Sequence, residues 1–270
     1  MVKKLIKHEF YAYLRTLLPI QLIVLGIATL CRFIQLFEND ELSYRIVFYS
    51  SVIALCIGVV VAVVMTMAYG ITRFYKNLFT GEGYLSFTLP VTPTQHIFAK
   101  LIMLLIATFA TIFAILLSVS VATAGDVFTE FIKAAVFLLK RFLHSRTAVH
   151  GVFIMVEIVA LFLVAVISQY LLCYGCIAVG QLVNKNRVLA AFGAYFAYYL
   201  FTQLVGTIMV LASTVVIRYI DTSAIYNYII THPNVATHLF FGFFIALYSA
   251  LSVIYFVVTK KIIEKRLNLE

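Results

Sequence analysis

The sequence predicts an all-α membrane protein with about six transmembrane helices. Of its 270 residues 64% are hydrophobic and 11% are charged, whereas an ordinary soluble domain carries about 25% charged residues. The mean hydropathy is +1.06. The apolar residues form runs of about 20 or more, the length that crosses roughly 30 Å of hydrocarbon. A soluble core this apolar would leave a surface that no polar shell could cover, so a large soluble catalytic domain is excluded.

Short polar segments separate the predicted spans. The spans cover residues 17–37, 46–71, 97–123, 152–179, 189–216 and 236–258. Residues 1–15 and 126–148 are amphipathic instead, with apolar side chains at helical spacing on one face and basic side chains on the others. Phe10 and Tyr13 belong to the apolar face of the first segment. This pattern predicts helices that lie at a membrane surface, with a charged lead-in to the first span as the alternative for residues 1–15.

Charge predicts the orientation of the chain. The net charge of +9 comes from Lys and Arg residues clustered beside apolar runs, which is typical of juxtamembrane segments and not of a nucleic-acid interface. Six spans place both termini on one side together with most basic clusters, and the positive-inside rule makes that side cytoplasmic. The basic helix at 126–148 falls on the opposite side, against the rule. The N-terminal segment lacks the pattern of a cleavable signal peptide, so we expect the first span to be retained.

Catalytic sequence motifs are absent. The chain contains no G-x-x-x-x-G-K-[ST], no H-E-x-x-H and no G-x-S-x-G. We therefore expect a protein that is not itself an enzyme, with no catalytic residue and no metal site. Cys173 and Cys176 form a C-x-x-C, a spacing used in redox and metal sites. No second Cys or His pair accompanies them, and the run around them is typical of a spanning helix, so we interpret both as packing residues.

Three polar residues inside apolar runs are candidates for a translocation path: Glu157, Tyr195 and Tyr199. An unpaired carboxylate is costly in a membrane, so Glu157 should face the bundle interior, a partner or water. The structural alternative is an interhelical hydrogen bond to Gln169, Gln203 or a hydroxyl group. The two tyrosines accompany small residues at close spacing, which indicates an aromatic-lined cavity, a dimer seam or ordinary helix packing. Those small residues are Ala190, Gly193, Ala194 and Ala197.

The most informative segment, residues 72–96, lies between the second and third predicted spans. It is too polar to span the membrane and too hydrophobic for a disordered loop. Its glycines permit sharp turns, and Pro90 and Pro93 should stop helices. Such a segment could dock into a groove on a cytoplasmic partner, with an interfacial loop that binds no partner as the alternative. The predicted docking residues are Phe79, Gly81, Glu82, Gly83, Tyr84, Leu85, Phe87, Leu89 and Pro90.

The run GEGYLSFTLPVTPTQHIFAK resembles the segment between the second and third spans of ABC-2 type transporter permeases. In that family a reentrant turn or short helix ends in Leu-Pro-(Val/Ile)-(Ser/Thr), followed by a Lys near the start of span three. The matching residues here are Leu89, Pro90, Val91, Thr92 and Lys100. Residues 82–85 resemble the acidic-glycine entry common in Firmicutes-type members. The layout of spans is similar throughout the chain, and the amphipathic insert at 126–148 is the departure.

The resemblance implies that residues 1–270 form one permease domain of an ABC exporter in a bacterial cytoplasmic membrane. Two such subunits, identical or homologous, would pair with two separate ATP-binding subunits, which would hold the ATP and Mg. Residues 79–90 would couple this chain to the ATPase. The expected cargo is a peptide such as an antimicrobial peptide, a lipid or a drug-like amphiphile. A stand-alone secondary transporter or channel is the alternative, and an intramembrane enzyme is disfavoured by the missing catalytic motifs.

Overall fold

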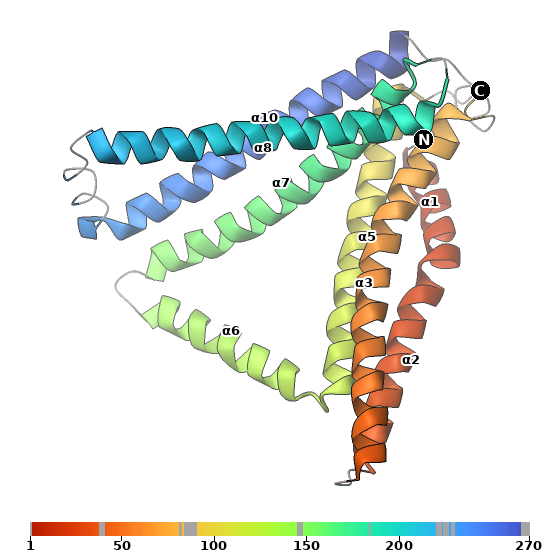
Figure 1. Cartoon of the computed structure of the whole chain (residues 1–270), viewed down its shortest axis with the longest axis vertical. Coiled ribbons are helices and arrows are strands. Elements are labelled where there is room, and N and C mark those ends of the chain that lie inside the picture. Colours follow the sequence, from red (N-terminus) through yellow and green to blue (C-terminus); the bar gives the residue numbers. More distant parts are fainter. Residues whose placement is uncertain are drawn as a thin grey trace. The chain divides into compact units, whose positions relative to one another are not determined.

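The computed structural model describes residues 2–37, 41–80, 83, 91–144, 148–183, 185–219, 223, 227 and 230–265. Within these ranges the chain forms α-helices and no strand (Figure 1). The helices are α1 (Val2–Thr16), α2 (Leu18–Gln35), α3 (Leu42–Phe79), α5 (Pro93–Ala122), α6 (Asp126–His144), α7 (Ala148–Gly180), α8 (Arg187–Tyr219) and α10 (Pro233–Lys265). They form two compact units: an N-terminal unit, Met1–Arg141, and a C-terminal unit, Phe142–Glu270.

In the described part of the chain, six helical stretches are long and apolar enough to cross a membrane, which confirms the predicted all-α fold. Most helices extend beyond the predicted spans. Helix α3 runs on to Phe79, and α10 runs on to Lys265 through much of the expected charged tail. The prediction ended each span where hydropathy fell, but a helix continues past that point because its backbone hydrogen bonds are internal.

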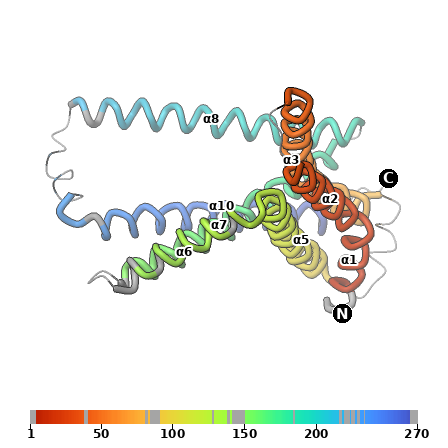
Figure 2. Tube along the Cα trace, turned by 90° about the horizontal axis from the view of Figure 1, so that it is seen from below, coloured from red at the N-terminus to blue at the C-terminus, as the bar shows by residue number. Residues whose placement is uncertain are grey.

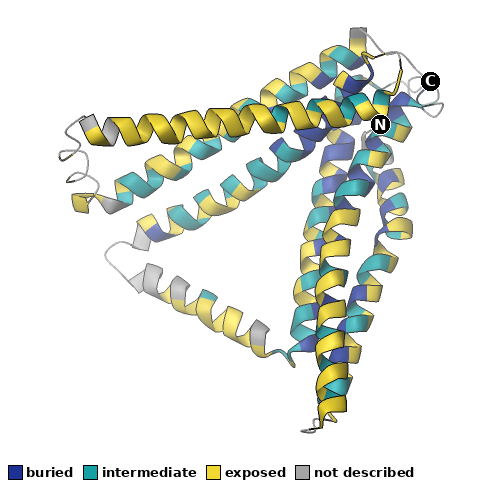
Figure 3. Cartoon of the chain, viewed as in Figure 1, coloured by how far each residue is buried: buried dark blue, intermediate teal, exposed yellow. Residues whose placement is uncertain are grey.

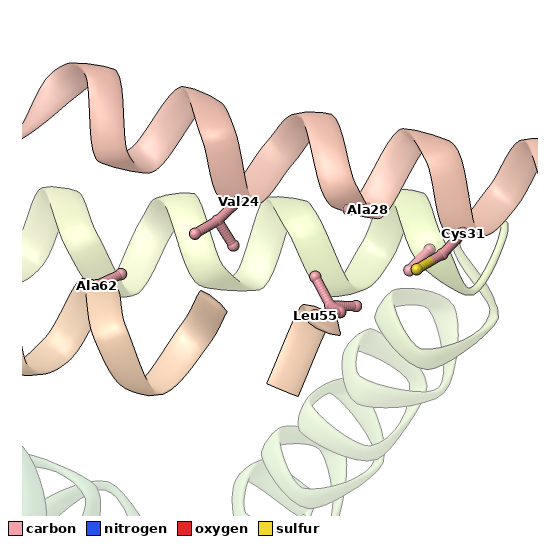
Figure 4. Packing of buried hydrophobic residues seen from close by; sticks show 6 residues of the cluster. Val24, Ala28, Cys31, Leu55 and Ala62 are labelled. Atoms are coloured by element: carbon pink, nitrogen blue, oxygen red, sulfur yellow. The ribbon is translucent and has the colours of Figure 1, made fainter. Parts of the chain in front are cut away.

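The N-terminal unit packs α2, α3 and α5 against one another, as the foreshortened view of Figure 2 shows. Val24, Ala28 and Cys31 of α2 meet Leu55 and Ala62 of α3 in a buried cluster (Figure 4). Several of these side chains are small, so the helix backbones can approach closely without a large apolar core.

Helix α1 continues almost directly into α2. The Leu17 amide donates to the Tyr13 carbonyl at 2.8 Å, and the Gln21 amide donates to the Leu17 carbonyl at 3.1 Å. Pro19 lies in the first turn of α2, where its missing N–H costs little. The buried face of α1 carries Glu9 and Tyr13 and continues to Leu17 at the junction with α2, while Phe10 is 40% exposed. The amphipathic N-terminal helix therefore packs within the unit through a face rotated from the predicted one.

Helix α5 starts at Pro93, four residues before the predicted third span, and no helix runs through this proline from Thr92. Proline is well suited to the first helical position, where its fixed φ is already helical. Thr92 caps the helix: its hydroxyl accepts from the Gln95 amide at 3.4 Å, and the Gln95 side chain accepts from the Thr92 amide at 3.2 Å. This capping box marks the start of the third span.

Helix α6 confirms the helical part of the prediction for residues 126–148, as far as His144. Its side chains between residues 129 and 137 are mostly exposed. Lys133 Nζ lies 2.9 Å from Glu130 Oε1 in an exposed pair one helical turn apart. No packing of α6 on another helix is found in the described part of its own unit.

In the C-terminal unit α7 packs along α10 and, less extensively, against α8. Helices α7 and α8 lie close together at Gly180, where an added Cβ would lie 2.7 Å from the Arg187 carbonyl and 2.8 Å from Ala191. Beyond this joint α8 has no buried residue between 187 and 215 (Figure 3). An added Cβ at Gly193 would meet nothing within 4 Å, so within this unit the predicted small-residue seam is not a site of close packing.

Candidate functional site

The segment between α3 and α5 is shorter than predicted. Residues 72–79 belong to α3 and residues 93–96 belong to α5, so residues 80–92 form the connection. Of the nine predicted docking residues the structure describes Phe79 and Gly83. The other seven, Gly81, Glu82, Tyr84, Leu85, Phe87, Leu89 and Pro90, lie outside the described residues.

Phe79 is an anchor and not an exposed docking side chain. It has no exposed surface, and its ring lies 5.8 Å from that of Phe74 at an angle of 66°. Leu78 and Ile97 are equally buried, so apolar residues fix both ends of the connection. The hydrophobic residues of this segment were predicted to contact a partner protein. At Phe79, the first of the predicted docking residues, the side chain is covered by the chain itself.

A buried ionic cluster lies beside these anchors. It consists of Glu9 from α1, Arg73 and Asn77 from α3, and Lys100 from α5; we call it the Glu9 cluster. Lys100 Nζ donates to Glu9 Oε1 at 2.8 Å, and Asn77 Nδ2 donates to the same oxygen at 3.3 Å. Arg73 Nε donates to Oε2 at 3.1 Å, and Nη2 lies 3.0 Å from that oxygen. Both carboxylate oxygens of Glu9 are therefore satisfied.

Burial makes the Glu9 cluster energetically important. The Glu9 and Lys100 side chains are each 5% exposed, and the Arg73 side chain is 26% exposed. A buried ion pair is costly to desolvate, and removing one partner leaves an uncompensated charge. Lys100 Nζ also lies 3.4 Å from the Arg73 carbonyl oxygen, to which it donates. The cluster thus joins α1 to the last turns of α3 and the first turns of α5.

A neutral polar network continues from the Glu9 cluster into the bundle. The Tyr13 hydroxyl and the Gln21 amide exchange hydrogen bonds at 3.1 and 3.0 Å. Gln21 Nε2 also donates to Thr111 Oγ1 at 3.0 Å, and that oxygen lies 2.9 Å from Thr66 Oγ1. These contacts connect α1, α2, α3 and α5 within an otherwise apolar unit, where hydrogen bonds between helices replace bonds to water.

Glu157 has an interhelical partner, but not one of those predicted. His238 Nδ1 of α10 lies 2.9 Å and 3.0 Å from the two carboxylate oxygens. Gln169 donates to the Tyr195 hydroxyl instead, and Gln203 donates to the Tyr199 hydroxyl. Glu157 therefore makes the expected kind of contact with a residue 81 positions away, for which the sequence offered no pairing information.

The structure does not bring the three predicted path residues together. Tyr195 and Tyr199 are 39% and 49% exposed on α8, and each hydroxyl is bonded to a glutamine. Glu157 is held by α10. Their role in a translocation path stays a prediction. Cys173 and Cys176 are buried free thiols on α7, in keeping with packing residues.

Comparisons with known proteins return no match. No protein-family model, no curated protein and no solved structure is significantly similar to this chain.

Proposed function

We propose that the chain is the transmembrane subunit of an ABC-2 type exporter, driven by ATP that a separate subunit hydrolyses. The observation that carries this proposal is the Glu9 cluster. It joins three helices on both sides of residues 80–92, the segment that resembles the coupling element of such permeases. A movement of that segment would reach α1, α3 and α5 together.

The mechanism we propose divides the work between two chains. The partner ATPase, in two copies, binds ATP and Mg and closes when it binds nucleotide. Residues 80–92 sit in its groove and move with it. The rigid ends of α3 and α5 then transmit this displacement to a dimer of permease subunits, identical or homologous. The cargo class that fits a wholly transmembrane subunit is a peptide, lipid or drug-like amphiphile.

The orientation in this proposal places residues 80–92 and both termini in the cytoplasm of a bacterial cell. Arg73 and Lys76 precede the connection and Lys100 follows it, which agrees with the positive-inside rule. Six apolar helical stretches support a multi-pass membrane protein.

The second candidate function is a stand-alone secondary transporter or channel. The pairing of Glu157 with His238 favours it, because ionisable side chains between spanning helices occur in ion-coupled transport. Secondary transporters place such groups near the bilayer midplane, in interrupted helices. Here both residues lie within the first three turns of uninterrupted helices, so we rank this function second.

Affinity purification of the chain from its native membrane tests the proposal most directly. We expect a P-loop ATPase to co-purify in equal amounts and the isolated chain to hydrolyse no ATP. Recovery of an active transporter without any ATPase would favour the second candidate function instead.

The coupling role is tested on the recovered complex. Leu85→Asp or Phe87→Asp should abolish stimulated ATPase activity while the chain still inserts into the membrane. Phe131→Asp, on the exposed face of α6, is the matched control and should leave the activity unchanged. A fully coupled complex carrying Phe87→Asp would contradict the assignment of residues 80–92.

A further inference from the structure

Three ionisable side chains contact one another near the first turns of α7 and α10, with His238 between the other two. His150 is in the first turn of α7, Glu157 lies two turns further on, and His238 is in the second turn of α10. His238 Nδ1 lies 2.9 Å from Glu157 Oε1, and His238 Nε2 lies 3.3 Å from His150 Nδ1. The two imidazole ring centres are 5.5 Å apart. His238 therefore uses both ring nitrogens to join two positions on α7.

This triad is within reach of water. Helix α7 has 33 residues and is about 50 Å long, whereas the hydrocarbon core is only about 30 Å thick, so its first turns extend toward the interface. His150 is exposed, and the side chains of Glu157 and His238 retain 24% and 25% of their exposure. We expect this exposed surface to face the interface, where protons from the compartment on this side can reach all three groups.

The number of protons on the triad determines which contacts can form. Glu157 as a carboxylate only accepts, so His238 Nδ1 must carry a proton. The contact between His238 and His150 needs one proton between the two nitrogens. His150 can donate it to a neutral His238, or His238 can carry it as an imidazolium that donates to both neighbours.

A further proton makes the contact between His238 and His150 repulsive. With both imidazoles charged, His238 Nε2 and His150 Nδ1 would both be donors, so no hydrogen bond could form between them. Two like charges would also face each other across the 5.5 Å between the rings. The contact to Glu157 would survive, because a carboxylate attracts either form.

We propose that His150, His238 and Glu157 form a proton-binding clasp that holds the start of α7 to the start of α10 and releases His150 when both imidazoles are protonated. The other ionisable groups on the helices around this clasp also belong to the C-terminal unit. Helix α8 returns from the Gly180 joint, so its last turn, with Arg218, belongs to this end. His232 precedes α10 and bonds to Thr231. On α10 the cations Lys260 and Lys261 lie at the far end.

The proposal goes beyond export, because it assigns this end of the C-terminal unit a ligand of its own. Histidine is the side chain that ordinarily changes charge between about pH 5 and 8. In the orientation proposed above, the clasp faces the outside of the cell. Acidification of that side would then move the first turn of α7, with His150, away from α10, while Glu157 still holds His238 and the ATPase is unchanged.

Spin labels on the two helices test the clasp in the full-length chain. Cys31, Cys173 and Cys176 are buried, so a Cys56→Ala background removes the exposed native thiol. Phe153→Cys and Leu239→Cys then place one label on each helix, at positions 56% and 67% exposed. The separation of the labels is measured in lipid nanodiscs at about pH 8, 6.5 and 5.

We expect a narrow distribution of distances between the two spin labels at the two higher pH values. At about pH 5 this distribution should shift to longer distances. His150→Ala should abolish the acid shift, because no second imidazolium then faces His238. His150→Gln, which is uncharged but can still hydrogen-bond, should do the same and guards against a packing defect. His232→Ala is the control and should shift like the parent. No acid shift in the parent, or an equal shift with His150→Gln, would overturn the proposal.

Discussion

Glu9 and Glu157 are two carboxylates with the same task, since each joins helices through basic side chains, yet they differ in their access to water. Glu9 is held by three donor side chains and is 5% exposed, whereas Glu157 has one imidazole partner and is 24% exposed. A buried charge must be paired at all times. A charge at the interface can exchange its partner for water or a proton. The N-terminal unit therefore has a permanent joint, and the C-terminal unit has an adjustable one.

The largest effect is expected from breaking the permanent joint. Lys100→Met leaves Glu9 short of its closest cation and should lower the free energy of unfolding by about 3–5 kcal/mol. Unfolding by SDS in mixed micelles measures the loss. Adding Glu9→Gln to Lys100→Met should not restore it, because Arg73 then also loses the carboxylate to which it donates. Equal stability of Lys100→Met and the parent chain would contradict a structural role for the cluster.

The next effect concerns the tight approach of α7 and α8 at Gly180. Gly180→Ala pushes a methyl group against the backbone of Arg187 and Ala191, which should cost about 1–3 kcal/mol. Gly193→Ala has open space and should instead stabilise α8 by about 0.5–1 kcal/mol through helix propensity. Both are measured by the same SDS titration. A loss of stability with Gly193→Ala would show that another surface packs on α8, as the dimer-seam interpretation requires.

A smaller loss is expected at the adjustable joint. Glu157→Gln keeps the size of the side chain and a hydrogen bond to His238 but removes the charge, which should cost about 1 kcal/mol. Glu9→Gln, the matched change in the N-terminal unit, should cost clearly more because it leaves Lys100 and Arg73 without their anion. If the two substitutions cost the same, burial would not distinguish the two carboxylates.

The smallest effect is expected at the exposed pair on α6. Lys133 and Glu130 are 70% and 71% exposed, so Lys133→Ala should change stability by only about 0.2–0.5 kcal/mol. The change should disappear at high salt, because exposed charges are screened. A loss as large as that of Lys100→Met would mean that α6 packs against another surface.

The spans could be predicted because hydropathy is local, whereas the Glu9 cluster could not be predicted from local patterns. Glu9 bonds to Arg73 and Lys100, which lie 64 and 91 residues away. One signal was present: Glu9 is the single acidic residue among the first 37 and falls four and eight residues before Tyr13 and Leu17, on one helical face.

The contacts of Phe79 and Glu157 could not be predicted, and the reason is the same for both. Hydropathy shows that a side chain avoids or needs water but not which helix covers it. The ring of Phe79 packs against Phe74 of the same helix, and the packing of α7 on α10 brings His238 to Glu157. The capping of α5 by Thr92 was readable in principle, since Thr-Pro-x-Gln is a helix-start pattern.

The length of α3 has a mechanical consequence. Its 38 residues make a rod of about 57 Å, nearly twice the roughly 30 Å of hydrocarbon that it crosses. If the bilayer holds this rigid helix near its middle, the helix can tilt about that point. A sideways shift at Phe79 would then appear at the Leu42 end in the opposite direction and with comparable amplitude. One face of the membrane could in this way report to the other without any change in the rod itself.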